Sequence, residues 1–170
     1  MLAGEKNSND IKNLDNNQLK ILAQEIREEI LQVVNKNGGH LASNLGIVET
    51  TIALHRTFDF SKDKLIFDVG HQCYAHKILS NRAEKFSTIR QRGGISGFPD
   101  REEGDAFSAG HAGTSISAAL GYADARDKLN QDYYVVTVVG DGALSNGLNL
   151  EALSVATEKP KKFIVMRWKL

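Results

Sequence analysis

The chain has 170 residues, of which 41% are hydrophobic and 25% charged, a composition typical of a soluble globular domain. Its 21 Lys and Arg residues balance 21 Asp and Glu residues, so the formal net charge is zero. This balance removes the long-range attraction that a basic protein has for nucleic acid or anionic lipid, and neither is an expected partner. No apolar run approaches the roughly 20 residues that span a bilayer, and the amino terminus lacks the features of a secretory signal. We therefore expect a cytoplasmic protein without a membrane helix.

The chain reads as one domain behind a short leader. Residues 1–13 are rich in polar side chains and are interpreted as a solvated leader, and residues 14–170 as a single domain without repeats. The one cysteine, Cys73, cannot form an internal disulfide, which fits a reducing compartment.

The apolar pattern predicts alternating helices and strands. Leu19, Leu22, Ile26, Ile30 and Val33 recur at helical spacing, and the run 133–139 (YYVVTVV) is typical of a strand buried on both faces. In chain order the predicted elements are a helix ending at 37–39, a helix at 46–58 capped by Ser43 or Asn44, a strand at 64–69, a long functional loop at 82–113, a helix rich in small residues at 114–129, a strand at 133–139, a helix at 148–157 and, after Pro160, a strand at 163–166. This alternation predicts an α/β fold with a doubly wound, mainly parallel sheet flanked by helices.

The residues that follow two of these strands are candidates for binding a diphosphate. Parallel α/β sheets bind ligands outside the carboxyl ends of their strands, where Gly70 and His71 follow one strand and the sequence GDGA, 140–143, follows another. Glycine lets backbone amides approach a diphosphate closely. Asp141 would repel a bare diphosphate, so it is interpreted as a ligand of Mg²⁺, which typically takes one or two carboxylates plus phosphates. The alternative is a tight strand-to-helix turn with Asp141 as its cap.

Two other kinds of site fit these residues less well. The G-x-G-x-x-G spacing of a Rossmann dinucleotide site is not met, because Ser145 stands where its last glycine belongs. A zinc site at His71, Cys73 and His76 is disfavoured because two histidines five residues apart do not share a helical face, and Cys73 is expected to pack as a small apolar residue. His40, His71 and His111 lie in glycine-flanked links, where each could point into a cleft or simply satisfy a local hydrogen bond.

Several blocks of the sequence resemble the 1-deoxy-D-xylulose-5-phosphate synthases, thiamine-diphosphate enzymes related to transketolases. The blocks are, in the order of that family, GGHLASNLGIVETTIALH, DKLIFDVGHQCYAHKIL, RQRGGISGFPDR, AGHAGTSISAALG and VVGDGAL. They extend from about Leu14 to Val165. GDG occurs in thiamine-diphosphate enzymes generally, whereas GHLASNLG and DVGHQ are specific to the synthases.

The resemblance implies an activity, cofactors and a set of site residues. The family joins pyruvate to glyceraldehyde 3-phosphate with loss of CO₂, which gives 1-deoxyxylulose 5-phosphate for isoprenoid, thiamine and pyridoxal synthesis. It implies thiamine diphosphate and Mg²⁺ as cofactors and a cytoplasmic homodimer as the working state. The residues it implies are Asp141 for Mg²⁺, Gly142 and Ala143 for the diphosphate, His71, Gly110, His111 and Ala112 for further cofactor contacts, and His40 for proton transfer near the reacting carbon.

The chain also departs from that family. A second magnesium ligand, an Asn, is expected at position 170, where this chain has Leu170, and AGHAGT and SNGLN replace commoner sequences. The family's pyrimidine-binding domain, which supplies the activating glutamate, is not represented in these residues. We therefore expect the chain alone to be inactive. It would be either the diphosphate-binding module of a synthase, completed by another chain, or a truncated or split-gene remnant without catalysis.

Overall fold

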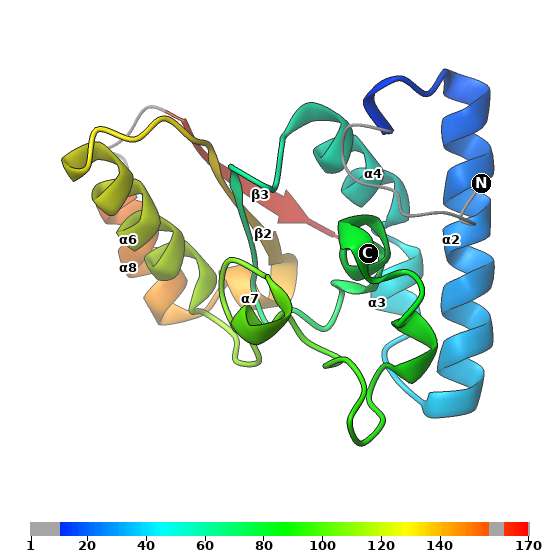
Figure 1. The fold of residues 1–170 in the computed structure, drawn as a ribbon. Helices are drawn as coiled ribbons and strands as arrows, with labels where there is room; N and C mark the ends of the chain where they lie inside the picture. Colours follow the sequence, from blue (N-terminus) through cyan, green and yellow to red (C-terminus); the bar gives the residue numbers. More distant parts are fainter. Residues whose placement is uncertain (1–10, 157–161, 170) are drawn as a thin grey trace. The chain divides into compact units, whose positions relative to one another are not determined.

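The computed structural model describes residues 11–156 and 162–169. The chain divides into two compact units, which are described separately below and can be followed in Figure 1. The helical unit comprises residues up to 59 together with 71–97, and the sheet unit comprises 60–70 together with the residues from 98 onward. Residues 1–10 of the predicted leader, as well as Thr157, Pro160 and Leu170, lie outside the described residues.

The longest helix of the helical unit is α2 (Asn16–Asn37). Asp15 caps it, since its side chain accepts hydrogen bonds from the Asn17 and Gln18 amides while the Gln18 side chain bonds back to the Asp15 amide. The predicted apolar stripe is buried from Leu22 to Val33, and Leu19 is half-buried. Ile11, within the range predicted as a polar leader, is fully buried.

The remaining elements of this unit are short apart from one further helix. They are α3 (Ala42–Leu45), α4 (Val48–Thr57), α5 (Tyr74–Lys77) and the turns η1 (Ile78–Arg82) and η2 (Phe86–Thr88). The prediction that Ser43 or Asn44 caps the second helix was wrong. Ile47 precedes α4 without a side-chain cap, because the Asn44 side chain bonds to backbone groups far away in the sequence.

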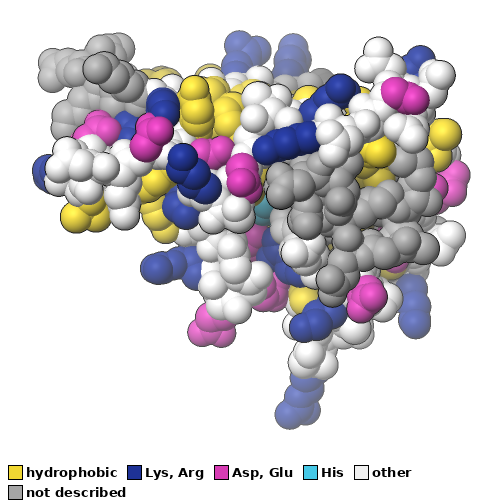
Figure 2. Space-filling view, turned by 45° about the horizontal axis from the view of Figure 1, so that its top comes forward, with side chains coloured by type: hydrophobic (Ala, Val, Ile, Leu, Met, Phe, Trp, Pro, Cys, Tyr) yellow, Lys and Arg dark blue, Asp and Glu magenta, His cyan; other side chains and the backbone are white. Residues whose placement is uncertain are grey.

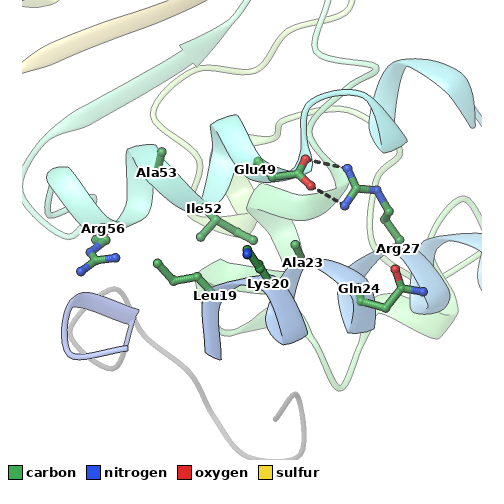
Figure 3. Close-up of a pocket in the computed structure, with 9 residues that line it drawn as sticks. All are labelled: Leu19, Lys20, Ala23, Gln24, Arg27, Glu49, Ile52, Ala53 and Arg56. Carbon is green, nitrogen blue, oxygen red and sulfur yellow. Dashed lines mark hydrogen bonds and ion pairs between the residues drawn. The ribbon is translucent and has the colours of Figure 1, made fainter. Parts of the chain in front are cut away.

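Helices α2 and α4 line a half-open pocket of about 480 Å³ (Figure 3). Arg27 and Glu49 form a two-bonded ion pair across it, with nitrogen–oxygen distances of 2.6 Å. This ion pair lowers the pKa of the Glu49 carboxyl. The pocket is lined by Leu19, Lys20, Ala23, Gln24, Arg27, Glu49, Ile52, Ala53 and Arg56, so it contains none of the predicted site residues.

The sheet unit is built on three parallel strands, as predicted. They are β1 (Lys64–Phe67), β2 (Val135–Gly140) and β3 (Phe163–Trp168), in the order β1-β2-β3. Lys64 pairs with Val135, and Val135 pairs with Phe163 on its other side. Every residue of β2 from 135 to 139 is buried, as expected of a covered central strand, although the strand begins at Val135 rather than at Tyr133 and Tyr134 is exposed.

Two helices of the sheet unit, α6 (Ser115–Lys128) and α8 (Gly147–Ala156), run side by side against the sheet (Figure 1). Ala119 and Ala123 of α6 pack on Ile66 and Val135, where small side chains permit close approach of the helix. The short helix α7 (Asp141–Leu144) follows β2 directly, and the turn η3 (Arg101–Glu103) lies in the long loop predicted at 82–113.

No described helix of residues 11–156 combines the length and apolarity needed to cross a bilayer. On the face seen in Figure 2, basic and acidic side chains are interspersed. This pattern agrees with the zero net charge of the sequence.

Candidate functional site

In the helical unit the structure brings together two of the predicted site residues, His40 and His71. Their rings lie with centroids 5.1 Å apart at an interplanar angle of 61°. His40 is exposed and follows Gly38 and Gly39, both at positive φ. At Gly39 a Cβ atom would lie 2.7 Å from the Tyr74 hydroxyl, so only glycine allows this turn to pass so close to the ring.

Asn44 holds the backbone of both histidines in place. It is fully buried, and its Nδ2 donates to the carbonyls of His40 at 2.5 Å and His71 at 2.8 Å. Its Oδ1 accepts the Tyr74 amide at 2.9 Å. This role cannot be seen in the sequence, because both distant partners lie 27 or more residues along the chain, where no local pattern reveals them.

The His71 imidazole has a lowered pKa and one buried nitrogen without a partner among the described residues. Burial, and secondly the charge of the neighbouring His40, lowers the pKa of His71 below its ordinary value. Its Nδ1 is buried and has no hydrogen-bond partner within the described residues. Because a buried polar atom without a partner costs free energy, this nitrogen favours a ligand that supplies one.

In the sheet unit the predicted magnesium ligand stands at the carboxyl end of β2. Asp141 is exposed and is the first residue of α7. Its Oδ1 accepts the Gly142 amide at 2.9 Å, so the carboxylate is held beside the turn with its second oxygen available to solvent or a metal. The alternative interpretation was partly right, since GDG does form a strand-to-helix turn, but Gly140 rather than Asp141 occupies the cap position.

The second predicted segment, Gly110 to Ala112, lies exposed just before α6. Glycine supplies free space at both segments. An added Cβ atom would meet nothing within 4 Å at Gly110, Gly140 or Gly142. Open backbone of this kind, beside the first turns of helices, suits the approach of an anionic group such as a diphosphate.

The two segments of the sheet unit lie next to each other. An added Cβ atom at Gly113 would come within 2.3 Å of the Asn146 side chain. The structure therefore brings the 110–113 turn close to the turn that follows α7. The eight predicted site residues are divided between the units: His40 and His71 belong to the helical unit, and the others, in the 110–112 and 141–143 segments, to the sheet unit.

The residues of the alternative zinc site are used differently. His76 Nδ1 lies 2.8 Å from Nε2 of His55, and Cys73 is fully buried. Across residues 11–156 and 162–169 there is no group of three or more His, Cys, Asp or Glu side chains placed to hold a metal ion. Asp141 on its own fits Mg²⁺, which can complete its coordination with phosphate oxygens and water.

Solved structures define the fold class of this arrangement. Transketolase from Leishmania mexicana superimposes with a TM-score of 0.78 at 24% identity, covering 89% of this chain and 27% of that one. A transketolase from Pichia stipitis gives a TM-score of 0.74 at 22% identity over 88% of this chain and 26% of that one. The chain thus has the transketolase fold, which confirms the predicted doubly wound α/β class.

The sequence comparisons narrow this class to a family. The family profile described as 1-deoxy-D-xylulose-5-phosphate synthase matches residues 2–167. The chain therefore belongs to the 1-deoxy-D-xylulose-5-phosphate synthase family, as the sequence blocks predicted. Relatives with this name from Dehalococcoides mccartyi strain BAV1 and Carboxydothermus hydrogenoformans are each 57% identical over 159 residues, 92% of this chain. The chain spans about a quarter of their length, 25% and 26% respectively.

Proposed function

We propose that this chain is the part of a 1-deoxy-D-xylulose-5-phosphate synthase that binds the diphosphate of thiamine diphosphate through Mg²⁺. In this proposal Asp141 is a magnesium ligand, and the backbone of Gly142 and Ala143 holds the diphosphate. His71 and the segment Gly110, His111 and Ala112 make further cofactor contacts. The observation that carries the proposal is the open glycine backbone at the carboxyl edge of the sheet, beside an exposed carboxylate.

The charges at this edge explain why the metal is needed. A carboxylate at Asp141 and a diphosphate repel each other at close range, and Mg²⁺ between them converts that repulsion into two attractions. The chain's own groups therefore orient the diphosphate arm.

The reaction we propose for the complete enzyme is the one that the family name describes, with pyruvate and glyceraldehyde 3-phosphate as substrates and loss of CO₂. Bound thiamine diphosphate would supply the carbanion and electron-sink chemistry. His40 is exposed and lies beside the neutral His71, so it is available to move a proton near the reacting carbon. We place this reaction in the cytoplasm, as a step that supplies isoprenoid, thiamine and pyridoxal synthesis.

We further propose that the sheet unit docks against more protein, either in a homodimer or on a chain that carries the pyrimidine-binding domain. Support comes from α8, where Leu148, Leu150 and Val155 are each more than half exposed. Leu148 and Val155, seven residues apart, lie on the same face of this helix, and exposed apolar surface on one face typically marks an interaction surface.

Calorimetric titration of the chain with thiamine diphosphate, with and without Mg²⁺, tests the proposed function. We expect binding that requires Mg²⁺ and weakens at least tenfold in Asp141→Ala, because the carboxylate that holds the metal is lost. Glu102→Ala, which removes another exposed carboxylate from the same unit, should bind like the wild type. Equal affinity in Asp141→Ala, or no heat from a chain that circular dichroism shows to be folded, would contradict the proposal and favour a non-catalytic remnant.

A further inference from the structure

A buried carboxylate, Asp68, stands at the carboxyl end of β1, directly after Phe67. Its side chain accepts hydrogen bonds from three other described residues. Oδ1 accepts the Gly113 amide at 2.9 Å, and Oδ2 accepts the Ser115 amide at 3.2 Å, the Ser115 hydroxyl at 2.7 Å and Nδ2 of Asn149 at 3.2 Å. One carboxylate therefore gathers groups from two other segments of the sheet unit.

Asp68 caps the amino end of α6, a role that a side chain next to the helix ordinarily has. Thr114 occupies the cap position of α6 and makes no side-chain cap hydrogen bond. The amides of Gly113 and Ser115, on either side of it, point instead to the Asp68 carboxylate. Because amides at a helix start lack partners within the helix, this long-range cap fixes where α6 begins and hence where residues 110–112 lie.

Asn149 extends the same contact to the GDG turn. It is fully buried on α8, and its Nδ2 donates both to Asp68 and to the carbonyl of Ala143 at 2.9 Å. Ala143 is the last residue of the GDGA sequence. The Asp68–Asn149 pair thus ties the start of α6 to the turn that carries the proposed magnesium ligand.

The backbone beside Asp68 adds to the constraint. Val69 has a φ of 58°, a left-handed conformation that is strained for a β-branched residue, and Gly70 follows at 88°. At Gly70 a Cβ atom would come within 2.3 Å of Pro99. Strained backbone of this kind persists only where surrounding contacts hold it in place, and the hydrogen bonds of Asp68 are such contacts.

We infer that Asp68 and Asn149 form a buried latch of positioning residues, which sets the spacing between the two diphosphate-binding segments, Gly110–Ala112 and Asp141–Ala143. Neither side chain touches the cofactor in this inference. They act through the backbone of Gly113, Ser115 and Ala143. The inference rests on the proposed function, because it assigns those segments to one diphosphate.

Amide hydrogen exchange of the ligand-free chain, measured residue by residue, tests the latch without the cofactor. In Asp68→Asn the new amide group faces N–H donors, and exchange at Gly113 and Ser115 should rise at least tenfold. In Asn149→Ala exchange should rise at Asn146, whose amide bonds to the Ala143 carbonyl. The control is Ala152→Gly, which weakens the same helix α8 without touching the latch.

The control separates positioning from general stability. After correction for the free energy of unfolding, the exchange rates of the Asp68 and Asn149 variants should exceed those of Ala152→Gly at these amides and at no others. If they match the control there, the latch is refuted. Should Asp68→Asn fail to fold, Asn149→Ala decides the question alone.

The second readout is affinity for thiamine diphosphate with Mg²⁺. We expect Asn149→Ala to bind at least tenfold more weakly than the wild type and Ala152→Gly to remain within threefold. Wild-type affinity in Asn149→Ala would refute the positioning role. If the wild-type chain itself binds no cofactor, the proposed function fails, and hydrogen exchange alone then decides whether the latch exists.

Discussion

Replacing Gly113 by alanine should destabilise the sheet unit, whereas the same change at Gly110, three residues earlier, should not. Gly113 is buried at a φ of 90°, and a Cβ atom there would overlap the Asn146 side chain at 2.3 Å. Gly110 is exposed, does not have positive φ, and has open space where its Cβ would be.

The magnitude at Gly113 has two parts. An alanine in the left-handed region costs about 1–2 kcal/mol. Displacing Asn146 also breaks the hydrogen bond that the Leu148 amide, at the start of α8, donates to Asn146 Oδ1, and loss of such a cap costs about 0.5–2 kcal/mol. The variant should therefore lose about 1.5–4 kcal/mol, which corresponds to a fall in melting temperature of about 3–16 °C for a chain of this size.

Urea unfolding followed by circular dichroism measures the difference in free energy of unfolding between the two variants. A second measurement is their affinity for thiamine diphosphate. Gly110→Ala should unfold within about 0.5 kcal/mol of the wild type, as surface changes usually do. It should nevertheless bind the cofactor more weakly, since its new methyl group fills space that the diphosphate needs. Equal stability of the two variants would refute the reasoning about the Gly113 contact.

Three further predictions concern the helical unit and the chain as a whole. Burial, and then the charges of His76 and Arg82, holds the pKa of His55 well below 6.5, so the stability contributed by this group is complete above about pH 6.5 and is lost as the pH falls. The free energy of unfolding, measured in urea, should fall by about 1.4 kcal/mol between about pH 7.5 and 5.5, and this fall should be absent in His55→Gln. An equal fall in that variant would contradict the assignment to His55. Asn44→Ala should cost about 2–3 kcal/mol and shift the ring resonances of His40 and His71, and unchanged resonances would exclude the proposed positioning. The purified chain with thiamine diphosphate and Mg²⁺ should form no product from pyruvate and glyceraldehyde 3-phosphate, because the resemblance places the activating glutamate in a later domain, and steady turnover would contradict this.

The periodic elements could be predicted from sequence because their signal is local. The stripe of α2 repeats at helical spacing over more than a dozen residues, and the β-branched run of β2 admits few alternatives to a buried strand. Both patterns show which side chains of a segment are buried, and this depends on residues close together in the sequence. The blocks around GDG and GGHLAS identified the family for the same reason, since each is a short contiguous sequence.

The contacts that arrange the candidate site could not be predicted in this way. Asn44 reads locally as a helix cap, but its partner Tyr74 is 30 residues away, and Asp68 meets Asn149 across 81 residues. Sequence also cannot distinguish Gly113, which is required by a tight contact, from Gly110, which leaves space for a ligand. These differences arise only when distant segments pack together.

The central claim, that the carboxyl edge of the sheet unit holds the diphosphate, is tested most directly by following backbone amide resonances during titration with thiamine diphosphate and Mg²⁺. The largest changes should occur at residues 110–113 and 140–143, and they should vanish when Mg²⁺ is removed. Changes confined to the pocket between α2 and α4, or no changes in a folded chain, would contradict the account.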